Sequence, residues 1–277
     1  MALNSIAIKQ IIGAWAFDNK DEIKWMCGMV ENLQIQQDGE TTEKRDNNGS
    51  TIFTIDRNKS CTITFDSSVM DLNLIAALNG TDRTDGSLRV PYIERHTITS
   101  GDLDAGKITL SKNVAPISEG VYKISFHTLT TDGSLKDNYT QSSTATVSAT
   151  TFAYDSTNNK ITLPASGGSQ ALAEGTRVEI VYEFLAESAV KITNAADKFP
   201  DAAKVRFLVL AVDLCQQDVC RALWITANNA KPQTGNTIGF NLDDTISVTL
   251  NLAYSYCDKS KDFYEITVAD EDFTWNN

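Results

Sequence analysis

Apolar and polar residues alternate with a period of two along much of the chain. In residues 59–65, KSCTITF, the side chains of Cys61, Ile63 and Phe65 fall on one side of an extended backbone and hydroxyl groups on the other. The alternation recurs in residues 121–127, 177–184, 245–254 and 264–268. Dipeptides that favour turns separate the runs, at Asp38-Gly39, Asn48-Gly49, Asp85-Gly86 and Asp132-Gly133. Because alternation lets one face of a strand meet a core, the pattern predicts a mainly β, antiparallel sandwich or barrel.

One segment departs from this alternation. Residues 65–80, FDSSVMDLNLIAALNG, offer Ser67 or Ser68 as an N-cap and Gly80 as an end. The apolar positions follow helical spacing, at Val69, Leu72, Ile75 and Ala76. The segment predicts one principal α-helix over about residues 67–78. A second helical candidate, residues 188–199, contains β-branched residues that disfavour a helix, so its structure stays open.

Two polar segments and one apolar segment stand out against the strands. Residues 36–50, QQDGETTEKRDNNGS, separate strands expected near 30–35 and 51–56, and residues 129–150 form a second excursion rich in serine and threonine. Loops of this length are uncommon in compact domains unless they contact something. By contrast, residues 205–214, VRFLVLAVDL, are apolar on both faces, which predicts a strand in a sandwich centre or at a subunit contact.

Composition and charge narrow the class of protein. The chain of 277 residues is 42% hydrophobic and 22% charged, which is typical of a globular protein. Its formal net charge is −12, from 36 acids and 24 bases. Because affinity for DNA comes mainly from Lys and Arg, this charge suits high solubility, or a wall that DNA passes without binding.

The amino terminus and the cysteines bear on localisation. Residues 1–17 lack a basic region before the apolar stretch and carry Lys9 within it, so we expect a leading strand instead of a signal peptide. No apolar run approaches the ~18 residues of a membrane span. Five scattered cysteines, an odd number, favour a reducing compartment.

Cys215 and Cys220 lie close together in AVDLCQQDVCRALWI, with strands predicted on both sides. A structural zinc site needs four ligands, whereas the other cysteines are isolated and the only histidines are His96 and His127. We therefore expect the two cysteines to be small strand residues on either side of a short loop, Gln216 to Val219, and predict no metal or cofactor.

Two further motifs imitate binding loops. Residues 101–107, GDLDAGK, match the spacing of a phosphate-binding loop, but Ile108 replaces the required Ser or Thr and a strand is predicted next. We expect a β-turn. Pairs of aspartates that imitate part of a calcium loop lack the closing glutamate, namely Asp82 with Asp85 and Asp102 with Asp104.

The histidines supply the only candidate for a general base. Glu94 and His96 share one face of a predicted strand, but no nucleophile is evident nearby. His127 follows the polar face of its strand, where we expect an imidazole in solvent or at an interface. These observations predict that the chain is not an enzyme.

The order of the predicted elements carries a resemblance to a known family. An opening strand pair, IIGAWAF and WMCGMVENLQI, precedes the long polar loop, and TIFTIDRNKSCTITFDSSVMDLNLIAALNG follows as strand, strand and helix. The later strands include ATTFAYDSTNNKITLP, GTRVEIVYEF and a strand ending in VDLC, before the closing ADED. This order resembles the tail tube (major tail) proteins of tailed bacteriophages over most of the chain, and least through residues 90–150.

The resemblance implies a single β domain over residues 1–277, with residues 90–150 as an insertion or outer decoration. In the family, six subunits form a ring whose inner sheets join into a barrel, and rings stack into a tube around an acidic channel that conducts DNA. The helix at 67–78 would pack outside this sheet. The resemblance also implies an inter-ring stacking loop made of Gln37, Asp38, Gly39, Glu40, Glu43, Lys44, Arg45, Asp46, Asn47, Asn48 and Gly49.

The implied partners are further copies of the chain, the tape measure, the tail terminator, and baseplate or tail-tip proteins. The implied location is the virion tail, assembled in the host bacterial cytoplasm. Two alternatives share the composition: a capsid decoration or other virion structural protein, and a carbohydrate-binding β-sandwich. The latter needs clustered aromatic side chains, whereas the tryptophans are dispersed in sequence, at Trp15, Trp25, Trp224 and Trp275.

Overall fold

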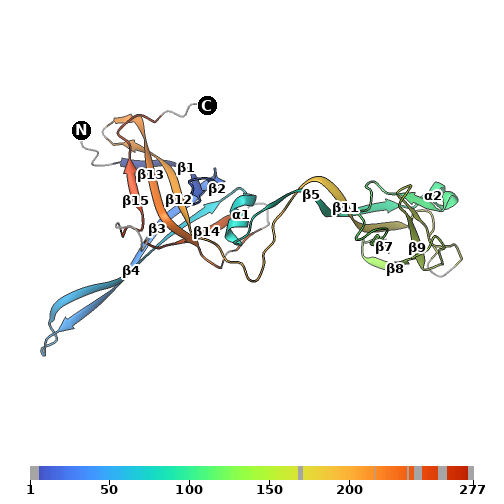
Figure 1. Cartoon of the computed structure of the whole chain (residues 1–277), viewed down its shortest axis with the longest axis horizontal. Helices are drawn as coiled ribbons and strands as arrows, with labels where there is room; N and C mark the ends of the chain where they lie inside the picture. The colour runs from blue at the N-terminus through green and yellow to red at the C-terminus, as the bar shows by residue number, and fades with distance from the viewer. Residues whose placement is uncertain are drawn as a thin grey trace. The chain divides into compact units, whose positions relative to one another are not determined.

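The computed structural model describes residues 6–167, 171–214, 216–235, 237–239, 245–254 and 261–273. The described chain is mainly β, as the alternation predicts, with antiparallel and mixed sheets (Figure 1). It divides into two compact units. Unit 1 comprises Met1–Arg83 and Ile192–Asn277, and unit 2 comprises Thr84–Lys191.

Unit 1 is built on one curled antiparallel sheet that forms a half-barrel. The strand order among the described residues is β2-β1-β12-β13-β14-β4-β3, and β15 also pairs with β13. β13 uses one edge for two partners, because Leu223 to Thr226 pair with β15 and Ala230 to Pro232 pair with β14. The strands are β1 (Ile6–Phe17), β2 (Ile23–Cys27), β3 (Val30–Arg45), β4 (Thr51–Ser67), β12 (Ala203–Asp213), β13 (Gln216–Pro232), β14 (Ile246–Leu252) and β15 (Glu265–Val268).

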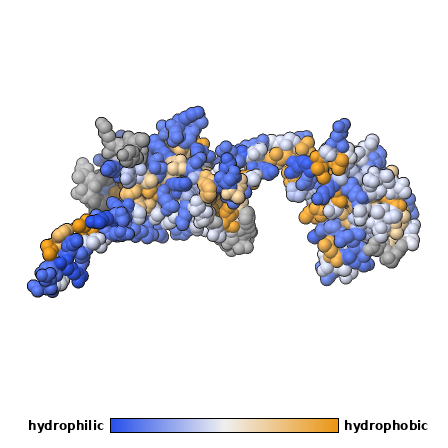
Figure 2. Space-filling model, turned by 60° about the horizontal axis from the view of Figure 1, so that its bottom comes forward, coloured by the Kyte–Doolittle hydropathy of each residue, from blue (hydrophilic) through white to orange (hydrophobic). Residues whose placement is uncertain are grey.

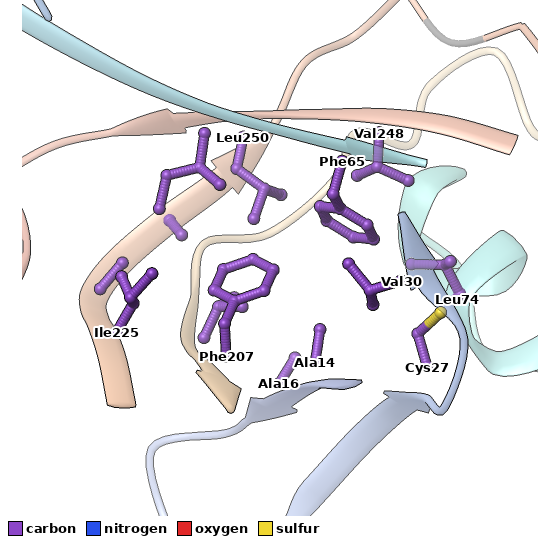
Figure 3. Close-up of a cluster of buried hydrophobic side chains, with 14 of the residues drawn as sticks. Ala14, Ala16, Cys27, Val30, Phe65, Leu74, Phe207, Ile225, Val248 and Leu250 are labelled. Atoms are coloured by element: carbon purple, nitrogen blue, oxygen red, sulfur yellow. The ribbon is translucent and has the colours of Figure 1, made fainter. Parts of the chain in front are cut away.

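One face of this sheet carries the core of unit 1. Alternate side chains of the strands point inward, and Leu74 of the helix α1 (Leu72–Leu78) packs against them (Figure 3). Leu78 of the same helix belongs to this core. Phe65 and Phe207 meet edge to face, with ring centroids 5.4 Å apart. Each fully buried side chain of this size stabilises the fold by about 1.5–3 kcal/mol. The alternation of apolar residues in the strands therefore determines which face of the sheet α1 packs against.

β12 occupies the middle of the sheet, between β1 and β13. Phe207 and Val209 enter the core, and Leu208 on the opposite side is also only 2% exposed. The prediction of a strand buried on both faces is confirmed for this central part of β12.

The principal helix starts later than predicted. Asp71 caps it by accepting from the backbone N–H of Asn73 at 2.7 Å and of Leu74 at 3.3 Å. Ser67 is instead the last residue of β4, because its strand pairs with both β14 and β3 up to that point. A start near residue 67 and a serine cap were therefore wrong. Ile75 and Ala76 are buried as expected, whereas Val69 and Leu72 are exposed.

Unit 2 holds a separate sheet and core. Its strand order is β5-β11-β7-β8-β9-β10-β6, and β8 and β9 run parallel. Phe126 lies at the centre of the core, 5.3 Å from the Tyr139 ring and 5.4 Å from the Phe152 ring. The strands are β5 (Thr84–Thr97), β6 (Lys107–Thr109), β7 (Ile124–Leu129), β8 (Leu135–Gln141), β9 (Thr151–Asp155), β10 (Lys160–Thr162) and β11 (Arg177–Lys191).

Two segments of the chain differ from a helix or turn suggested by sequence. Residues 188–199 form no helix, because β11 continues to Lys191, which pairs with Thr84. Residues 101–107 contain most of a short helix, α2 (Ser100–Ala105), in place of the β-turn. The short strand β6 follows α2 directly, so the predicted strand is present where a phosphate-binding loop would continue as a helix.

Candidate assembly surfaces

The polar segment expected to be a loop is a two-stranded β-ribbon. β3 and β4 pair from Asp38 opposite Ser60 to Arg45 opposite Thr51, and only residues 46–50 form the turn. The prediction of a structureless loop over 36–50 is thus wrong. We call residues 38–60 the arm. Figure 1 shows it in blue, projecting from the sheet of unit 1.

Side chains across the ribbon hold the arm together. Thr41 donates to Asp56 at 2.8 Å, and Asn58 donates to Glu40 at 2.9 Å. In the turn, the Asp46 carboxylate accepts from the backbone N–H of Asn48 and Ser50. Such cross-strand pairs each contribute about 0.2–1 kcal/mol. At ~3.3 Å per residue, the arm reaches about 25 Å beyond Asp38.

The predicted stacking residues all lie on this ribbon or at its root. Gln37 donates to the Tyr264 hydroxyl at 2.5 Å, which ties the root of the arm to the segment before β15. The remaining members are exposed in β3 or in the turn. Sequence reasoning missed the exposed apolar side chains near the tip, Ile52 and Phe53, which are 64% and 50% exposed. They are consecutive in the short run T-I-F-T-I (residues 51–55), whose pattern does not distinguish an exposed strand from a buried one.

The helix α1 does not cover the second face of the unit 1 sheet, and this face is mainly polar. We call it the open face: it includes Glu31, Gln34, Gln36, Thr62, Thr64, Asp66, Lys204, Arg206, Trp224, Thr226, Lys231, Ser247, Thr249, Asn251, Glu265 and Thr267. A shallow groove of about 420 Å³ lies over β12, β13 and β15, between Arg206, Trp224 and Glu265. The charged members of this set are three cations and three carboxylates.

The tryptophans are less dispersed than the sequence suggests. The rings of Trp15 and Trp224 lie 5.9 Å apart, because β1 and β13 both flank β12. Trp25 is buried and stacks on Phe65 in the core, and Trp275 lies outside the described residues. Among the described tryptophans, Trp15 and Trp224 therefore form one ring pair, on the side of the sheet that carries the open face.

The two ends of the curled sheet are unpaired within the described residues. β2 forms one edge and β3 the other. Ile23 and Met26 of β2 are 58% and 51% exposed. Exposed strand edges present free backbone N–H and C=O groups that pair readily with another chain. Both edges are therefore candidate contacts between subunits.

The candidate general base has a different partner from the one predicted. His96 Nε2 lies 2.9 Å from Asp102 Oδ2, whereas Glu94 accepts hydrogen bonds from Ser111 and Tyr182. The prediction that Glu94 and His96 form a pair is thus wrong, because α2 brings Asp102 to the imidazole. Burial raises the pKa of Asp102, but hydrogen bonds from His96 and Thr99 outweigh it and hold the pKa at about 2.

His127 is buried within unit 2, whereas we expected its imidazole in solvent or at an interface. β7 lies between β11 and β8 in the sheet, and Phe126, His127 and Thr128 are buried in succession, so side chains on both of its faces are covered. The His127 Nε2 atom lies 3.2 Å from Glu179 Oε1, and Arg95 donates to the same carboxylate. The hydrogen bond from Arg95, together with that from His127, lowers the pKa of Glu179. The Glu179 carboxylate is therefore held by hydrogen bonds from strands β5 and β7 on either side of β11.

The cysteines give no metal site in the part of the chain that is described. Cys27 and Cys61 are free and buried in the core of unit 1, and Cys220 is half-buried. Cys215 lies outside the described residues, and with it any pairing to Cys220. β13 already begins at Gln216, so the expected loop from that residue to Val219 belongs to a strand with an irregular register. No described group of three or more His, Cys, Asp or Glu side chains is placed to hold a metal ion.

Comparisons with known proteins place this geometry in context. The model of the YomU/Tube protein family matches residues 7–266, which include both units. Comparison with curated proteins finds no match. Among the described helices, neither is long and apolar enough to cross a membrane.

Proposed function

Since this chain belongs to the YomU/Tube protein family, a family of phage tail tube-like structural proteins and not of enzymes, we propose that six copies form a ring and that rings stack into a tail tube. The observation that carries the proposal is the curled sheet of unit 1. Within the residues that the structure describes, each end of the sheet is a strand paired on one side alone, one face is apolar and covered, and the other face is open and polar.

Ring formation follows from the two edges. β3 of one subunit and β2 of the next would continue the sheet across the subunit boundary. Closing a sheet through neighbours removes the edges that otherwise promote uncontrolled association. The exposed Ile23 and Met26 on β2 add apolar area to that contact. The half-barrel of one subunit thereby becomes a segment of a larger barrel.

The open face would line the channel, with α1 on the outer side of the sheet. Its hydroxyl and amide side chains can exchange hydrogen bonds with water as DNA passes. Lys204 and Arg206 are accompanied by Asp66 and Glu265, so this face alone does not concentrate the net charge of −12. The acidic channel expected from the net charge therefore depends on carboxylates beyond the open face, which repel phosphates and prevent DNA from binding.

Unit 2 would be an outer decoration of the tube. It contains residues 90–150, which the sequence assigned to an insertion, and it has its own core. The arm would contact the adjacent ring as the stacking element. Tape measure, terminator, and baseplate or tail-tip proteins would bind at the channel and at the tube ends in the virion tail.

Negative-stain electron microscopy of the purified protein over a range of concentrations tests this proposal. We expect six-fold rings or hollow tubes that become more abundant as concentration rises. Monomers at every concentration would contradict the proposal. Binding to a capsid shell without self-assembly would favour a decoration protein instead.

A further inference from the structure

The β3–β4 ribbon carries exposed apolar side chains at both of its ends. At the tip, Ile52 and Phe53 are 64% and 50% exposed; we call these two residues the tip patch. Figure 2 shows apolar surface on the arm amid hydrophilic atoms. At the opposite end, Met29, Val69 and Met70 are 59%, 50% and 43% exposed; we call them the base patch.

The base patch gathers because the two strands start and end together. Val30 pairs with Ser67, so the residues just outside them lie side by side. Ser68 Oγ lies 3.8 Å from the Met29 sulfur, and Ser67 Oγ donates to the Val69 carbonyl at 2.7 Å. The base patch is therefore held by ordered contacts at the sheet end of the ribbon.

The charge directly across from Phe53 is opposite in sign to the charges at the base. At the tip, Lys44 is the cross-strand partner of Phe53, so both point to the same side, and Lys44 forms no ion pair with a described residue. At the base, Glu31 faces Asp66 across the strands, and neither carboxylate is paired with a described cation. Like charges placed directly opposite each other are destabilising, so a cation supplied from outside would relieve this pair.

We propose that the tip patch of one copy docks on the base patch of the next copy. Phe53 packs against the methionine sulfur atoms, a contact that aromatic rings favour, and Lys44 approaches Glu31 and Asp66. The inference rests on the proposed function and names the surface that receives the arm. Because tip and base lie at opposite ends of one ribbon, the contact is head-to-tail and repeats without closing. The distance between successive rings should not exceed the ribbon length of about 55 Å.

Charge reversal tests the pairing. Lys44→Glu places a third carboxylate at the contact, and Glu31→Lys adds a cation that repels Lys44 and leaves Asp66 as the one carboxylate of the pair. Each change should raise the concentration needed for tube growth, about tenfold for Lys44→Glu. The double variant restores opposite charges and should grow tubes as the wild type does. Sedimentation of polymer and electron microscopy at fixed salt measure growth, and circular dichroism verifies that each variant is folded.

Replacing exposed apolar residues by serine tests the docking contact independently of charge. Phe53→Ser should block tube growth and leave the subunit folded, because the side chain is half exposed. Leu135→Ser, at a residue 63% exposed in unit 2, is the matched control and should grow tubes normally. Single charge variants that grow normally, or a double variant that stays blocked, would overturn the docking while tube formation by the wild type still supported the proposed function. A wild type that never assembles would overturn both.

Discussion

Asp102 sits at the third position of α2 and accepts hydrogen bonds from His96 and from the backbone and hydroxyl of Thr99. Thr99 and Asp102 thereby form a capping box, which satisfies backbone donors at the start of the helix. A carboxylate engaged in this way stabilises the segment between β5 and β6. The His/Asp contact is thus structural, in keeping with the non-enzymatic family.

The pKa of Asp102 predicts a dependence of stability on pH. Because that pKa is lowered from 3.8 to about 2, the charged carboxylate stabilises the fold above pH 4, and this contribution is lost as the pH falls toward 2. Asp102→Asn should therefore lower the Tm at pH 6 and have little effect at pH 2. Thermal unfolding at pH 2, 4 and 6 measures the difference. Asp104→Asn in the same helix is the control, and an equal loss of Tm at all three pH values for Asp102→Asn would refute the linkage.

Arg221 of β13 forms an ion pair with the end of the described chain. Its side chain is almost fully buried and pairs with Asp213 at 3.4 Å and Asp270 at 2.5 Å. The adjacent Cys220 N–H donates to Asp272 at 3.1 Å. Arg221→Ala leaves both carboxylates without this cation and should destabilise the fold by about 3 kcal/mol. Urea unfolding should register the loss, and limited proteolysis should cleave faster within residues 261–273.

Asp270→Asn is the milder comparison, because that carboxylate is 57% exposed and surface pairs contribute about 0–1 kcal/mol. Similar losses for Arg221→Ala and Asp270→Asn would mean that the buried position of the guanidinium contributes nothing beyond an ordinary surface pair.

At the scale of elements, alternation correctly indicated strands. The alternating segments overlap β4, β7, β11, β14 and β15. The strand pairing in the arm was not predicted, because a ribbon exposed on both sides has no apolar period and its sequence resembles that of a polar loop. The start of α1 escaped because strand pairing through Ser67 outweighs the capping ability of a serine. His127 escaped because its burial depends on neighbouring strands that are distant in sequence.

Shortening the arm separates folding from assembly. Glu40 pairs with Arg57, so residues 41–56 can be replaced by Asn-Gly, which favours a tight hairpin turn. Since the removed residues are mostly exposed, the Tm should change little, whereas tube growth should be abolished. Replacing only the turn residues 46–50 by Asn-Gly is the control and should preserve growth. Long tubes from the shortened arm would contradict a role in stacking.

At the scale of the molecule, two cores coexist on one chain. The buried clusters of unit 1 and unit 2 share no residue. The sequence shows no linker between the two units. The boundary falls at Thr84, where β5 begins, and at Lys191, where β11 ends. A boundary placed between paired strands carries no Gly-rich or Pro-rich signature, which explains why one domain was expected. Family membership extends over both units.

Removing unit 2 tests whether assembly belongs to unit 1 alone. Thr84 and Lys191 are cross-strand partners, so their Cα atoms lie about 5 Å apart and a short Gly-Ser linker can join Arg83 to Ile192. Because the sheet edges, the open face and the arm all lie in unit 1, the shortened chain should still form tubes. Their spacing between rings should match that of the wild type, and their outer diameter should be smaller. A folded variant that forms no tubes would instead assign unit 2 a necessary contact between subunits, because nothing else in the assembling surface has been altered.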